Sequence, residues 1–144
     1  MEDEPEVLLE VGGPVDELSV TLAIYGEDLE PLEIEKILDV TPTSAHRRGD
    51  RKPRGPEFKE GAYVVAVRAT SPEEVGRVLD DLLGQVPDSD GVWETLGTRY
   101  RVQVRFAAHI GSWNRGFGIS AAQVRRLARM KAELEFDIYA YTDE

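Results

Sequence analysis

A buried strand followed by an amphipathic helix lies near the middle of the chain, and it constrains the fold more than any other feature. Residues 63–67 are five consecutive apolar side chains, which is typical of a buried strand. Residues 71–74 have the pattern of a capping box, which marks the start of a helix. The apolar stripe of this helix has helical spacing and consists of Val75, Val78, Leu79, Leu82 and Leu83. A strand and a helix that both need an apolar partner predict a helix layer packed on a sheet.

The same periodicities place the other elements. Strands are predicted at 19–25, 99–106 and 134–138, and a helix at 31–38. A hairpin at 111–118 is predicted to lead into a further short strand. A third helix follows, and Ser120-Ala121-Ala122-Gln123 has the pattern of a capping box at its start. From residue 62 the predicted order is strand, helix, strand, strand, helix, strand. This order predicts an α+β, ferredoxin-like (split βαβ) antiparallel sheet with helices on one face, preceded by an extra N-terminal strand and helix.

The length of 144 residues predicts one domain. We assign residues 1–15 to an acidic tail, either partly disordered or adding an edge strand through Val7–Val11, and residues 16–144 to a single α+β domain. Periodicity disappears at about 41–60, where prolines, glycines and basic residues predict a long basic loop. Such loops are either functional or mobile.

The composition narrows the classes of function. The chain has no cysteine, which excludes disulfides, thiolate metal sites and cysteine nucleophiles. A formal net charge of −11 opposes general attraction to nucleic acid. The acidic N-terminus does not resemble a signal peptide, and no apolar run is long enough to span a membrane. We therefore expect a soluble cytoplasmic protein without a membrane association.

The basic loop contains the first group of candidate binding residues. His46, Arg47, Arg48 and Arg51 could together bind a phosphate or a carboxylate surface, and Gly49 would let the backbone approach. The segment lacks the spacing of a P-loop or a dinucleotide fingerprint, so a structural or protein-contact role is favoured over phosphate binding.

A second group follows the strand at 99–106. His109, Trp113, Asn114 and Arg115 combine an ionisable ring, an exposed aromatic side chain and polar groups. The alternative is that Trp113 folds back onto the domain, and both interpretations stay open. A hydrolase that uses His109 with Ser112 is a third, weaker hypothesis, because neither an elbow motif nor an oxyanion donor accompanies them. The two histidines have no carboxylate at ligand spacing, so no metal or cofactor is predicted.

Charge also predicts contacts between strands. Arg99, Arg101 and Arg105 alternate with apolar residues, and Glu135 and Asp137 do the same in the last strand. We expect salt bridges between these two strands, taken as antiparallel neighbours, in preference to a ligand-binding sheet face. Asp137 could instead hold an arginine of the basic loop.

Several segments together resemble one bacterial family, the domain of unknown function number 4279. The resemblance covers roughly residues 19–139, and the segments that carry it are Leu29-Glu30-Pro31, Pro42-Thr43, His46-Arg47-Arg48-Gly49, Gly116-Phe117-Gly118-Ile119-Ser120 and Phe136-Asp137-Ile138-Tyr139. It implies a bacterial origin and a shared fold, and it implies no catalytic residue.

These observations favour a non-enzymatic module that binds another protein, for example an acidic, immunity-type neutraliser of a partner. Its contact surface is either the acidic N-terminal third, which suits a basic partner, or the basic loop with the Trp113 hairpin. The alternative is a ferredoxin-like regulatory domain that senses a small anionic ligand at Arg47, Arg48 and Arg115. Such sheets can also pair edge to edge, so a homodimer is left open.

Overall fold

The computed structural model describes residues 17–70, 73–110 and 116–140. Within these residues the chain forms five strands and four helices, in the order β1 (Glu17–Gly26), α2 (Pro31–Leu38), β2 (Ser44–His46), β3 (Gly61–Ala69), α3 (Val75–Leu83), α4 (Asp90–Arg99), β4 (Arg101–Ile110), α5 (Ala121–Arg129) and β5 (Ala132–Ala140). The predicted tail at 1–15 lies outside the described residues. None of the helices in the described ranges is long and apolar enough to cross a membrane.

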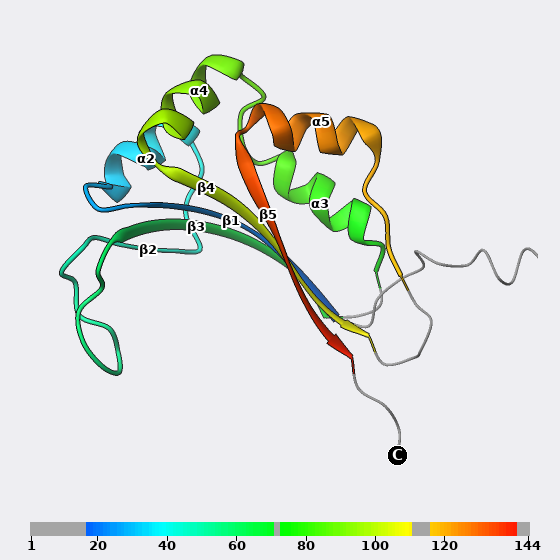
Figure 1. The fold of residues 1–144 in the computed structure, drawn as a ribbon, viewed down its shortest axis with the longest axis horizontal. Coiled ribbons are helices and arrows are strands. Elements are labelled where there is room, and N and C mark those ends of the chain that lie inside the picture. The colour runs from blue at the N-terminus through cyan, green and yellow to red at the C-terminus, as the bar shows by residue number, and fades with distance from the viewer. Residues whose placement is uncertain (1–16, 71–72, 111–115, 141–144) are drawn as a thin grey trace, which may run out of the picture.

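All of the described strands belong to one sheet, with β1 at its centre. The strand order is β2-β3-β1-β4-β5. β1 pairs antiparallel with β3 and with β4, so β3 and β4 run in the same direction on either side of it. β4 and β5 are parallel neighbours, because helix α5 returns the chain to the end of the sheet where β4 began. Figure 1 shows the four helices together on one face of this sheet.

The predicted α+β class and the single helix layer are therefore confirmed, whereas the finer topology is not. The ferredoxin-like order is replaced by the order given above, and the sheet is not fully antiparallel, since β4 and β5 are parallel. The predicted N-terminal addition is the central strand β1. The short strand expected after residue 118 is not formed by residues 116–120, which lead directly into α5.

Helix α4 was missed because its sequence has little apolar periodicity. Only Trp93 and Leu96 among its ten residues are buried. Its last residue is Arg99, which the charge alternation had placed in a strand. The loop predicted at 41–60 was also incomplete, because it contains the short strand β2.

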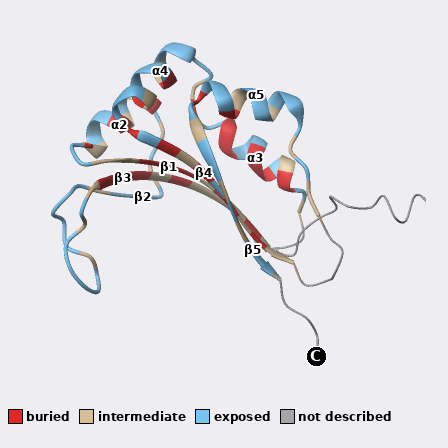
Figure 2. Cartoon of the chain, viewed as in Figure 1, coloured by how far each residue is buried: buried red, intermediate tan, exposed pale blue. Residues whose placement is uncertain are grey.

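Apolar alternation in the central strand explains how the two layers meet. Leu18, Val20, Leu22 and Ile24 point to the helix side of β1 and are buried, and the five predicted stripe residues of α3 are all buried against the sheet. Figure 2 shows this buried layer between the sheet and the inner helix faces. α5 begins with the predicted capping box, in which Ser120 accepts from the backbone N–H of Gln123 and Gln123 accepts from that of Ser120. The capping box predicted at 71–74 is wrong as the start of α3, because this helix begins at Val75 after the N-cap residue Glu74, which makes no side-chain cap hydrogen bond. The opposite face of the sheet has no helix among the described residues.

Tyr63 ties β3 to the segment after α2, and this contact predicts a pH dependence. Its ring is buried, its hydroxyl donates to the backbone oxygen of Val40, and burial raises the pKa of Tyr63 to about 12. An unfolded tyrosine titrates near pH 10, so the neutral phenol contributes stability that is fully present below pH 10. This contribution is lost as the pH rises through about 12.

We therefore expect the free energy of unfolding of the wild type to fall more steeply between pH 10 and pH 12 than that of Tyr63→Phe. Urea unfolding at a series of pH values measures both slopes. Parallel slopes would contradict the assignment of this titration to Tyr63.

Candidate functional site

Residues 47–60, here called the basic hairpin, connect β2 to β3 and project beyond the sheet (Figure 1). Two backbone hydrogen bonds close it, from Gly49 N–H to the Phe58 oxygen and from Phe58 N–H to the Asp50 oxygen, both 2.9 Å. A bridge between Arg51 and Glu57 extends this pairing. Gly49 and Gly55 have φ values of 91° and 104°, in the left-handed region that glycine tolerates. The predicted basic loop is therefore a hydrogen-bonded, hairpin-like extension of β2 and β3.

Aromatic stacking fixes the base of the basic hairpin. The rings of His46 and Phe58 are stacked with their centroids 3.4 Å apart, and the Lys52 ammonium lies 5.5 Å from the Phe58 centroid. Nearby, the Arg101 guanidinium lies over the Tyr25 ring and pairs with Glu60 at 3.2 Å. Tyr25, His46, Lys52, Phe58, Lys59 and Glu60 line a hollow of about 290 Å³.

Arg47 has a structural partner. Its guanidinium donates to both carboxylate oxygens of Glu30, each at 2.8 Å, and Glu30 is also the N-cap residue of α2. The hydrogen bonds from Arg47 hold the pKa of Glu30 below its usual value and raise that of Arg47. Arg47 thus fastens the basic hairpin to α2.

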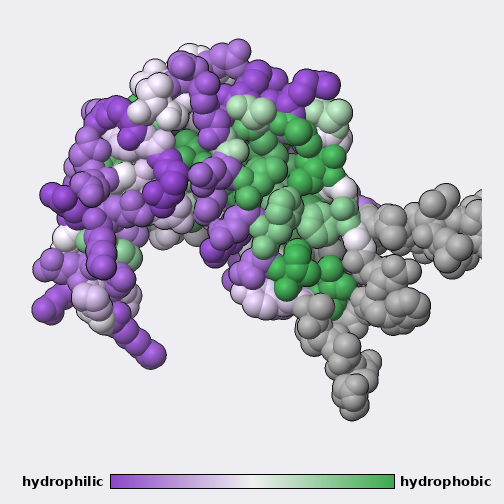
Figure 3. All heavy atoms as spheres, in the orientation of Figure 1, coloured by the Kyte–Doolittle hydropathy of each residue, from purple (hydrophilic) through white to green (hydrophobic). Residues whose placement is uncertain are grey.

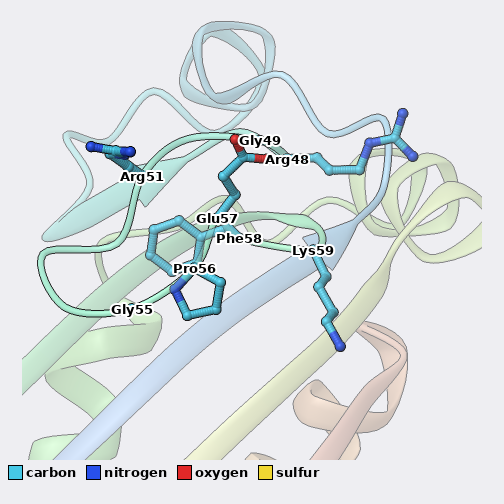
Figure 4. A pocket seen from close by; sticks show the side chains of 8 residues that line it. All are labelled: Arg48, Gly49, Arg51, Gly55, Pro56, Glu57, Phe58 and Lys59. Atoms are coloured by element: carbon cyan, nitrogen blue, oxygen red, sulfur yellow. The ribbon is translucent and has the colours of Figure 1, made fainter.

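The other cations of the basic hairpin diverge. Arg48, Gly49, Arg51, Gly55, Pro56, Glu57, Phe58 and Lys59 line an open hollow of about 710 Å³. Figure 4 shows the side chains of Arg48, Arg51 and Lys59 pointing in three different directions around it. Arg48 makes a long contact of 3.6 Å with Glu27, whereas Arg51, Lys52, Arg54 and Lys59 form no ion pair within the described part of the chain. The arrangement is a broad cationic surface and not a converging cradle.

The structure separates the two groups of candidate residues. His46 lies opposite Ala62 in β3, whose neighbour in β1 is Tyr25, whereas His109 lies opposite Glu17, at the other end of β1. Tyr25 and Glu17 are eight residues apart along β1, and eight residues of extended strand span about 27 Å. His46 and His109 therefore lie at opposite ends of the sheet. His109 stacks on Tyr139 with centroids 4.7 Å apart. Trp113, Asn114 and Arg115 lie outside the described residues, as do Ser112 and most of the predicted hairpin at 111–118.

Asp137 lies far from the basic hairpin. It is on β5 at one edge of the sheet, and the hairpin extends from β2 and β3 at the other edge, so the hypothesis that Asp137 holds an arginine of the loop is wrong. Its carboxylate accepts a hydrogen bond of 2.7 Å from the Tyr139 hydroxyl, which raises the pKa of Tyr139.

The expected salt bridge between the neighbouring strands does form. Arg105 and Glu135 pair at 3.1 Å, across strands that are parallel. Arg101 and Arg99 instead contact acids elsewhere: Arg101 pairs with Glu60, and Arg99 with Asp28 and Glu33.

Sequence reasoning missed the aromatic and lysine side chains at the base of the basic hairpin. Phe58 is the one apolar aromatic residue in a polar segment, and this isolation was a usable signal. Tyr25 and Arg101 could not be associated with the loop before the register of β1, β3 and β4 was known. Within the described ranges, no three His, Asp or Glu side chains are grouped so that they could hold a metal ion.

Comparison with known proteins identifies the family but not a function. No match was found among curated proteins or among solved structures. The sequence model of one family matches residues 16–141, nearly the whole chain, and includes both the basic hairpin and β5. The chain therefore belongs to the family described as domain of unknown function DUF4279.

Proposed function

We propose that this protein is a non-enzymatic module that binds another protein, with the basic hairpin as its contact surface and an acidic patch on the partner. The observation that carries the proposal is the outward, divergent arrangement of Arg48, Arg51 and Lys59 on a hydrogen-bonded hairpin. Cations that point apart can each meet a different carboxylate of a wide surface, whereas one small anion needs donors that converge on it.

The charge distribution supports specific association at this surface. The chain as a whole carries a net charge of −11, so an acidic partner is repelled from most of the molecule and attracted only where cations gather. Such steering selects the orientation of the encounter and makes its rate depend on salt. No catalytic residue is assigned in this proposal. A neutraliser of the immunity type is one concrete form of it, with the difference that the basic hairpin, and not the acidic part of the chain, contacts the partner.

Reversing two charges on the basic hairpin tests the proposal. We expect immobilised wild-type protein to capture a stoichiometric partner from a lysate of its source cells at low salt and to release it at moderate salt. Arg51→Glu with Arg54→Glu is expected to abolish capture, because it turns attraction into repulsion at exposed positions outside the core. Mass spectrometry identifies the partner, and circular dichroism verifies the fold.

The matched control changes the same net charge on the helix side. Arg77 on α3 and Arg125 on α5 are exposed, and replacing both with glutamate is expected to leave capture unchanged. Equal capture by the two double variants would contradict a role for the basic hairpin.

The alternative function is sensing of a small anionic ligand, and one observation favours it. The hollow of about 290 Å³ combines the His46–Phe58 stack with Lys52 and Lys59, which suits a flat, negatively charged molecule. This alternative also proposes a relation to ferredoxin-like regulatory domains. One split βαβ unit supports that relation, because β3 and β4 run in the same direction and β1 lies between them. A blank in the capture experiment, together with a thermal shift by anions that His46→Ala removes, would favour it.

The proposal includes a bacterial, cytoplasmic setting. The cysteine-free sequence supports the cytoplasmic part of this setting, because the fold then needs no oxidising compartment. The bacterial part rests on the family resemblance alone.

A further inference from the structure

The outer edge of β5 is a second surface with the features of a binding site. β5 lies at the end of the strand order and has one neighbour, β4, in the described sheet. Leu134, Phe136 and Ile138 are 39%, 50% and 44% exposed on the helix side of this strand. Figure 3 shows hydrophobic side chains gathered over β5 and α5. An edge strand with exposed apolar side chains is a template for pairing with another strand.

The opposite side of the same strand is acidic. Glu133, Glu135 and Asp137 alternate with the three apolar residues, so the carboxylates share the helix-free face. Among the cations of the described residues only Arg105 forms an ion pair with them, through Glu135. The edge therefore presents a row of three carboxylates on one face and a row of three apolar side chains on the other.

These carboxylates select the kind of strand that can pair here. In a sheet, a strand that keeps its apolar side chains beside Leu134, Phe136 and Ile138 places its alternate side chains beside the acids. A second copy of β5 would oppose acid to acid in every such register, and like charges in facing positions are destabilising. Residues 1–16 and 141–144 of the chain contain no lysine or arginine, so they offer no complementary charge.

We infer that the edge of β5 binds an extended segment of another protein in which apolar and basic residues alternate. The segment adds a sixth strand to the sheet, its backbone groups pair with those of β5, and its lysines or arginines lie over Glu133 and Asp137. This site is distinct from the basic hairpin in position and in the charge of the partner that it selects.

The test uses the full-length chain and blocked seven-residue peptides. The alternating peptide Val-Lys-Val-Lys-Val-Lys-Val is expected to slow amide exchange across β5 and to shift its NMR signals. A peptide of the same composition with the lysines grouped at one end is expected to have no such effect. The double variant Glu133→Lys with Asp137→Lys is expected to bind the alternating lysine peptide about tenfold more weakly than the wild type, since two attractive charge pairs across the strands become repulsive. The same variant should bind the corresponding glutamate peptide instead.

Two controls keep this test separate from the earlier proposal. Asp81→Lys with Glu94→Lys, on exposed positions of α3 and α4, makes the same change in net charge and should leave peptide binding intact. The basic-hairpin variant Arg51→Glu with Arg54→Glu should also bind the alternating lysine peptide like the wild type. Equal binding of the grouped and alternating peptides, or no binding to the folded protein, would overturn the inference. A dimer in sedimentation equilibrium that Phe136→Glu abolishes would assign the edge to a second copy and overturn it as well.

Discussion

Replacing Trp93 with alanine is expected to lower the free energy of unfolding by about 3–5 kcal/mol, the largest effect of any single substitution considered. The indole is 1% exposed and packs α4 into the core. Its Nε1–H donates to the backbone oxygen of Pro87 at 2.8 Å, so truncation both opens a cavity and leaves that carbonyl without its partner. A domain of ordinary stability has about 5–15 kcal/mol to lose.

Urea unfolding followed by far-ultraviolet circular dichroism measures this loss without depending on tryptophan fluorescence. Trp93→Phe is the matched control, because phenylalanine keeps most of the buried ring and loses the hydrogen bond. We expect it to retain more than half of the stability that alanine removes. A cost below about 1 kcal/mol for Trp93→Ala would mean that α4 does not depend on this contact.

The second large effect is expected at the junction between the basic hairpin and the sheet. A Cβ at Gly61 would lie 2.9 Å from the backbone oxygen of Leu29, 3.1 Å from its Cβ and 3.2 Å from the backbone oxygen of His46. Backbone atoms cannot move aside as a flexible side chain can, so Gly61→Val is expected to cost about 3 kcal/mol. It should also speed amide exchange in residues 46–60, because β2 must shift to make room.

Gly118→Val is the control for Gly61, since an added Cβ there meets no atom within 4 Å. Chemical unfolding and hydrogen exchange on both variants check the expectation. If Gly61→Val kept wild-type stability and exchange at residues 46–60, the close approach of Leu29 and His46 would not constrain the hairpin.

The elements that the sequence predicted well are those with a strong local signal. The stripe of α3 is set by spacing alone, and all five of its residues are buried. The capping box at Ser120 and Gln123 is likewise a property of four neighbouring residues. α4 has neither signal, because its two buried residues, Trp93 and Leu96, stand alone in a segment that is otherwise mostly polar residues and glycine. Its helical form depends on packing that a local pattern does not contain.

The candidate site shows the same division. The charge of the basic hairpin and its glycines are visible in the sequence, and they predicted a functional or mobile segment. The partners of individual residues are not visible there: Arg47 pairs with Glu30, seventeen residues away, and Asp137 lies on the far edge of the sheet. Contacts between residues that are distant in the sequence depend on which strands are neighbours. Strand order is not encoded in any short sequence pattern.

The sequence by itself determined the α+β class, most of the helices and strands, the apolar face of each, and the places where cations gather. Only the tertiary structure decided the strand order, the parallel pairing of β4 with β5, the structural use of Arg47 and the exposure of the acidic and apolar rows on β5. The physical reason is the distance along the sequence over which each kind of interaction acts. Periodicity, caps and turns act over a few residues, whereas strand neighbours and edges are chosen by burial summed over the whole chain.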